Sequence, residues 1–219
     1  MLNKSLFLAV MLIFMSSAVS FANTEARDLF QQLREKTFAR LPDKFTARLS
    51  GRSIDEKLES IPKDYIEEGK SAFAQLEFSK ENGISIKVKN VDFLYEDLFE
   101  QYVRFFSLGP VLSTRMDSSM LDRYDINFAG DSPGNRSILD VKFRNAQNKF
   151  LFYLALENFD IMRVDYLIED RLLSSTLIRY KDHKVGNKTY RIPDRFIVRT
   201  PEAAQGRPEY FDVSDIRFD

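Results

Sequence analysis

Apolar and polar residues alternate through much of the C-terminal half, and this two-residue period constrains the fold of the chain more than any other feature. From about residue 124 to residue 218, apolar residues alternate with polar ones in successive runs separated by short turns. Such alternation places one set of side chains on each face of a β-strand. The turns leave no room for crossover helices, so consecutive strands must pair antiparallel. We therefore predict one large, curled antiparallel sheet.

The N-terminal half adds further strands to this pattern. Residues 45–51 alternate and end at Gly51, and residues 72–78 and 84–88 alternate on either side of an Asn82-Gly83 turn. Asn-Gly between two alternating runs is a strong hairpin signal. Residues 52–69 show no clear period and are expected to be a long connection with a helical turn. The total is about nine or ten strands.

Two segments have helical spacing instead. Residues 24–41 carry an apolar stripe that ends before Pro42, which predicts an amphipathic helix packed on the sheet. Residues 92–121 interrupt the β pattern, with Asp92 as a cap, an aromatic stripe, and a second short helix around Val111 and Leu112. We expect this insertion to be a mobile lid over the mouth of the sheet. The fold class expected is α+β, an unclosed β-barrel wrapped over an N-terminal helix and a helical lid.

Residues 1–22 have the pattern of a secretory signal. Lys4 is the only charge, residues 6–15 are apolar, and Ser20 and Ala22 satisfy the small-x-small cleavage rule. The apolar run is about half of the ~20 residues that cross a bilayer. We predict a mature domain of residues 23–219 that does not span a membrane. A chain without cysteine fits a bacterial periplasm, since many small secreted eukaryotic domains depend on disulfides.

Composition excludes several kinds of function. There is no Cys and only one His, His183, so thiolate chemistry and multi-histidine metal sites are excluded. A net charge of -1 argues against nucleic-acid binding. His183 is expected in a solvated turn, and the acids at Glu169-Asp170 and at Asp92, Glu96 and Asp97 are interpreted as turn and helix-start residues. The sequence predicts no enzyme activity, no metal and no cofactor.

The aromatic content leaves two alternatives open. The chain has 20 Phe and 9 Tyr. On the inner face of a curled sheet, these rings either fill a core or line a cavity for an apolar ligand. Alternation also predicts that Ala74 faces the concave side. The candidate residues for the cavity and lid are Phe45, Ala47, Leu49, Leu76, Ile86, Val88, Leu98, Phe99, Tyr102, Val103, Phe106, Val141 and Phe143.

The C-terminal half resembles a known superfamily. Its segments IMRVDY (161–166), LLSSTLIRY (172–180), IPDRF (192–196) and FDVSDIRF (211–218), with a turn at Glu169-Asp170 and another at Gly186, are similar to the lipoprotein-sorting and carrier proteins of the LolA/LolB type. The resemblance implies an unclosed barrel whose apolar concave face accepts acyl chains in the periplasm. Its implied partners are an acylated lipoprotein or lipid, and envelope transport proteins. The alternative is a non-enzymatic sensor or assembly module of the same fold that acts through a protein partner.

Overall fold

The computed structural model describes residues 24–106, 121–132, 135–201 and 207–218. The signal sequence expected at residues 1–22 and the short helix expected around Val111 and Leu112 lie outside the described residues. Among the helices of the described ranges, none combines the length and apolar character needed to cross a membrane.

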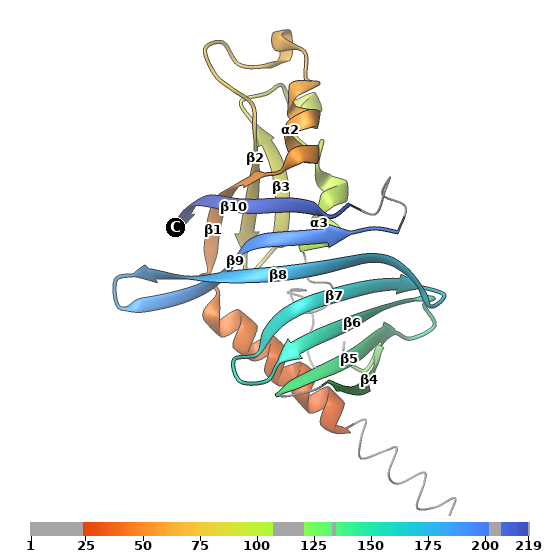
Figure 1. The fold of residues 1–219 in the computed structure, drawn as a ribbon. Coiled ribbons are helices and arrows are strands. Elements are labelled where there is room, and N and C mark those ends of the chain that lie inside the picture. Colours follow the sequence, from red (N-terminus) through yellow and green to blue (C-terminus); the bar gives the residue numbers. More distant parts are fainter. Residues whose placement is uncertain (1–23, 107–120, 133–134, 202–206, 219) are drawn as a thin grey trace, which may run out of the picture.

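The fold is a single ten-stranded antiparallel sheet that curls without closing (Figure 1). Its order is β3-β2-β1-β10-β9-β8-β7-β6-β5-β4, so β3 and β4 are its two edges. Strands β4 to β10 form a continuous meander, and β10 then pairs with β1, which joins the N-terminal hairpin to the meander. The predicted fold class is confirmed. The strands are β1 (Lys44–Ser50), β2 (Phe73–Ser79), β3 (Gly83–Lys89), β4 (Tyr124–Ser132), β5 (Arg136–Phe143), β6 (Asn148–Ala155), β7 (Asp160–Ile168), β8 (Arg171–Val185), β9 (Lys188–Arg199) and β10 (Glu209–Phe218).

The N-terminal helix, residues 24–40, covers part of the concave face, as its stripe predicts (Figure 1). The ring of Phe30 lies 6.1 Å from that of Phe152, which points inward from β6. Burial of such side chains is worth about 1.5–3 kcal/mol each, and it anchors the helix to the sheet. The buried residues of the stripe are Ala26, Phe30, Leu33, Thr37 and, just beyond the helix, Leu41.

The connection after β1 is more ordered than the sequence predicts. It contains helix α2 (Arg52–Glu59) and the 3-10 turn η1 (Lys63–Tyr65). Gly51, between β1 and α2, lies against β10, where a Cβ atom would come within 2.4 Å of the carbonyl oxygen of Tyr210. Glycine is needed here because of this close approach to another backbone.

The strand phases predicted from alternation are correct. Phe143 shares the inner face with Val141 but is 41% exposed, because it lies at the end of β5, where its ring packs 5.2 Å from that of Tyr124. A slip of one residue would have turned the whole set outward. The other predicted inward residues are all buried, namely Phe45, Ala47, Leu49, Ala74, Leu76, Ile86, Val88 and Val141.

The helix predicted to begin at Asp92 is wrong in its described part. The segment consists of two 3-10 turns, η2 (Phe93–Tyr95) and η3 (Glu100–Tyr102), followed by one α-helical turn, α3 (Val103–Phe106). The amide of Val88 on edge strand β3 donates to the carbonyl oxygen of Glu96 at 2.8 Å. In an α-helix the carbonyl oxygen of Glu96 would accept from the amide of Glu100. Here the amide of Glu100 donates to the carbonyl oxygen of Asp97, which is the spacing of a 3-10 turn.

The prediction that His183 lies in a turn is also wrong. Strands β8 and β9 continue as a two-stranded ribbon to a turn at Gly186 and Asn187, and His183 pairs with Tyr190 inside it. Its side chain is half-buried, with its ring centroid 6.1 Å from that of Phe218. The charged sequence of this ribbon hides its β character, because no apolar face alternates along it.

Candidate functional site: the concave face

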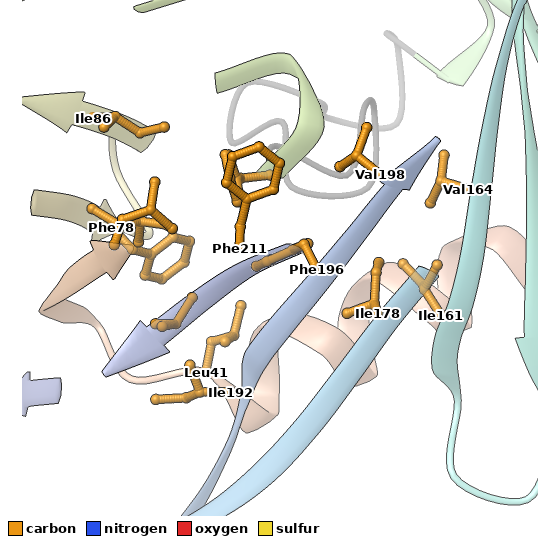
Figure 2. Close-up of a cluster of buried hydrophobic side chains, with 14 of the residues drawn as sticks. Leu41, Phe78, Ile86, Ile161, Val164, Ile178, Ile192, Phe196, Val198 and Phe211 are labelled. Carbon is orange, nitrogen blue, oxygen red and sulfur yellow. The ribbon is translucent and has the colours of Figure 1, made fainter. Parts of the chain in front are cut away.

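Within the described residues, the concave face of the sheet is largely filled by the protein's own side chains. Figure 2 shows inward residues of β2, β3, β7, β8, β9 and β10 gathered in one cluster, with Phe196 and Phe211 at its centre. Both rings are buried, and they come from neighbouring strands that pair at this position. The aromatic content therefore serves mainly as core in this conformation.

The segment 93–106 contributes rings to this core. Phe99 and Phe106 are fully buried, and the Phe106 ring lies 4.7 Å from that of Phe196 and 5.4 Å from that of Phe211, edge-on to both. Edge-to-face pairs add about 0.5–1.5 kcal/mol beyond the burial of their area. Leu98, Tyr102 and Val103 are half-buried against the same core. The predicted inward orientation is confirmed, whereas movement of this segment as a lid stays a prediction.

Polar contacts also hold this segment on the sheet. Lys87 of β3 forms an ion pair with Asp97, and Asp97 is the chief cause of the raised pKa of Lys87. The ammonium of Lys57, on α2, lies 4.9 Å from the ring centroid of Tyr102. Asp92 caps η2 by accepting from the amide of Leu94 at 3.1 Å, which confirms its interpretation as a cap.

A small apolar cavity remains under α3. It encloses about 30 Å³, and Thr37 lies at its wall with a buried hydroxyl oxygen that has no hydrogen-bond partner within the described residues. Such a space suits about one water molecule, which could bond to that hydroxyl. Of the predicted cavity residues, only Phe45, Leu76 and Phe106 line it. The full lining is Thr37, Arg40, Leu41, Phe45, Leu76, Phe78, Ile84, Phe106, Tyr180, Arg191, Ile192, Pro193, Phe196 and Val213.

A buried ionic cluster that sequence reasoning missed closes one side of this cavity. The carboxylate of Asp160 is 7% exposed and binds both Arg40, from the N-terminal helix, and Arg191, from β9. Arg40 also donates to the carbonyl oxygens of Asn158 at 2.5 Å and Phe159 at 3.0 Å. The hydrogen bonds to Asp160 raise the pKa of Arg191. These contacts clamp the helix end to the β6–β7 turn and to β9.

Tyr180 completes the wall beside the cluster. Its hydroxyl donates to the carbonyl oxygen of Ile161 at 3.2 Å, and burial raises the pKa of that hydroxyl. This hydrogen bond joins β8 to the start of β7, at the end of the two strands opposite to the β7–β8 turn. No local pattern in the sequence identifies the cluster, since Arg40 and Asp160 are 120 residues apart.

Two further carboxylates outside this cluster, Asp170 and Asp165, form ion pairs. Asp170, in the β7–β8 turn, pairs with Lys149, and this bond lowers the pKa of Asp170. On the convex face, Asp165 is buried and accepts two hydrogen bonds from Arg163 at 2.7 and 2.6 Å. Across the described ranges, no three or more His, Cys, Asp or Glu side chains are grouped so that they could hold a metal ion.

Comparison with known proteins adds little to this description. No protein-family model matches the sequence, and the search of curated proteins finds no match. A chain of the solved structure described as "Crystal structure of MucB in complex with MucA(peri)" is similar at 10% identity, covering 89% of this chain and 99% of that chain, with a TM-score of 0.30. At that score we carry neither a fold family nor a function over from it.

Proposed function

We propose that this chain is an exported, non-enzymatic binding module that acts by contact with another protein. The observation that carries the proposal is the filled concave face. Its cavity of about 30 Å³ is far below the roughly 300–1,000 Å³ of ordinary ligand pockets. The two buried carboxylates among the described residues, Asp160 and Asp165, are both bound by arginines. The outer surface is therefore the better candidate for function.

Three of the exposed apolar residues lie close together in sequence-distant turns at one end of the sheet. Tyr65, Phe93 and Leu94, which we call the apolar knob, are 40%, 73% and 66% exposed. They belong together, because the amide of Asp92 donates to the carbonyl oxygen of Tyr65 at 2.9 Å. Adjacent exposed apolar residues mark sites of protein interaction, and aromatic residues are prominent in such contacts. The apolar knob is the surface proposed to meet the partner.

Site-specific crosslinking tests this proposal. A photoreactive residue in place of Phe93 should give a discrete protein adduct in the cells that make this chain, because the side chain at this position projects from the apolar knob. The same residue in place of exposed Arg171, the first residue of β8, is the matched control and should give none. A lipid adduct alone at position 93, or no adduct there, would refute the proposal.

Carriage of acyl chains is the second candidate. It is favoured by the apolar lining of the small cavity and by the position of α3 above it. To admit an acyl chain, Phe99 and Phe106 would have to leave the core, and the chain would replace their contacts. This candidate therefore requires the opening of residues 93–106, which the protein-binding proposal does not.

A further inference from the structure

The β8–β9 ribbon projects beyond the rest of the sheet as an arm (Figure 1). We define the arm as residues 179–191. Strand β8 pairs with β7 only as far as Leu177, and β9 pairs with β10 only from Arg195 onward. Between these limits the two strands pair with each other, up to Val185 and Lys188. A two-stranded ribbon without a third strand is only marginally stable in water.

Contacts at its base keep the arm in place. The ring of Tyr190 stacks on that of Phe218 at 5.5 Å, and the His183 ring lies 6.1 Å from that of Phe218. Arg191 bonds to Asp182 across the ribbon at 2.8 Å and to Asp160 at the base. The arm is thus ordered before any partner binds, which lowers the entropic cost of binding.

The arm is strongly basic in a chain that is nearly neutral. It contains five Lys or Arg and one Asp, a net charge of +4, whereas the whole chain has -1. Its one acid, Asp182, is already bound to Arg191. Lys181 and Lys184 are exposed and are in no ion pair within the described residues, and exposed Lys188 lies near Asp43, whose main partner is Lys80. These three lysines surround the end of the ribbon.

The β8 backbone edge of the arm is open. On the β9 side the ring of Tyr190 packs on that of Phe218, at the end of β10, and at the base of β8 the hydroxyl of Tyr180 donates to the carbonyl oxygen of Ile161. From Lys181 to Val185, strand β8 has a ladder partner on the β9 side alone within the described part of the chain. An open edge of this kind can pair with an added strand.

From these observations we propose that the β8 edge of the arm, residues 181–185, binds an extended acidic segment of a partner protein as an added strand. Lysines on an edge strand normally deter pairing with other strands, and an acidic segment is the exception because its carboxylates pair with those lysines. The inference rests on the proposed function and names the chemistry of the partner. A membrane is disfavoured, since the tip, Val185-Gly186-Asn187, lacks the large apolar residues that insert into lipid.

Fluorescence anisotropy tests the arm directly with a labelled peptide that repeats Glu-Glu-Thr-Thr. This repeat places carboxylates on both faces of an added strand, as is needed because Lys181 and Lys184 lie on opposite faces of β8. The mature chain should bind this peptide and not its lysine–threonine counterpart, with affinity that falls as salt rises. Reversing three charges together, Lys181→Glu, Lys184→Glu and Lys188→Glu, should weaken binding by about tenfold or more. The matched control, Lys63→Glu, Lys142→Glu and Arg171→Glu, makes the same charge change at other exposed positions and should bind as the parent does. Thermal melting confirms that both variants are folded.

A peptide N-methylated at every residue separates strand pairing from simple charge attraction. It keeps its carboxylates but cannot donate backbone hydrogen bonds, so it should bind far more weakly. Equal affinity for it, equal weakening by the control triple, or binding of anionic phosphatidylglycerol vesicles instead of the peptide would overturn the inference. If any of these results is found and a protein crosslink still forms at position 93, the binding role of the arm is rejected. The proposed function then still stands.

Discussion

Replacing Phe106 by alanine is expected to lower the free energy of unfolding by about 3–5 kcal/mol, the usual cost of removing a buried phenylalanine ring. Phe106 is fully buried, makes two edge-to-face contacts with Phe196 and Phe211, and forms part of the wall of the small cavity. The variant would lose those contacts and merge the space of the ring with the existing cavity. Denaturant unfolding followed by circular dichroism measures the change.

Phe93→Ala is the matched control for Phe106→Ala. Phe93 belongs to the same segment but is largely exposed, so its removal should change the unfolding free energy by no more than about 0.5 kcal/mol. The comparison also separates a core segment from a lid. If the Phe106 variant keeps its stability while a hydrophobic fluorescent probe binds more tightly, residues 93–106 open independently of the sheet, and acyl carriage becomes the better proposal.

Replacing Asp160 by asparagine should cost about 3 kcal/mol, the low end of the range for removing one partner of a buried ion pair. The substitution keeps the shape of the side chain but leaves Arg40 and Arg191 without their shared anion. The side chain of each arginine is about one-quarter exposed. Water can therefore hydrate part of each guanidinium in the variant, which is why we expect the low end of that range. Hydrogen exchange should also accelerate at the C-terminal end of the N-terminal helix, because Arg40 holds that end to the β6–β7 turn.

Asp182→Asn removes a second partner of Arg191 and serves as the control for Asp160→Asn. Its carboxylate is 57% exposed, so the loss should be no more than about 1 kcal/mol. Losses of equal size in the two variants would show that burial of Asp160 contributes nothing special. Unchanged exchange in the helix would show that the cluster does not hold it.

The sheet could be predicted from the sequence because its signal is local. The two-residue period of runs such as 74–78 and 139–143 sets both the strand and the face of each residue, and the short turns set the antiparallel order. The helix over residues 24–40 was predictable for the same reason, since its stripe repeats within a few residues. Even Phe143, exposed at the end of its strand, lies on the expected face.

The features that were wrongly predicted or missed depend on contacts between residues far apart in the sequence. The spacing of Phe99, Tyr102 and Phe106 fits an α-helix. The amide of Val88 on edge strand β3 instead donates to the carbonyl oxygen of Glu96, and the segment folds as 3-10 turns. The pairing of Arg40 with Asp160 leaves no trace in either local sequence. Composition could not decide between a filled core and a cavity, because that depends on how the rings of 93–106 pack against β9 and β10.

Native mass spectrometry of the protein, purified without detergent from the cells that make it, tests the central claim most directly. If the concave face is filled by the protein's own side chains, the folded ion should have the mass of the polypeptide alone, or of a complex with a second protein. Harsher activation should then release a protein and no lipid. A folded ion that carries the added mass of a lipid or an acylated peptide, released on activation, would contradict the account.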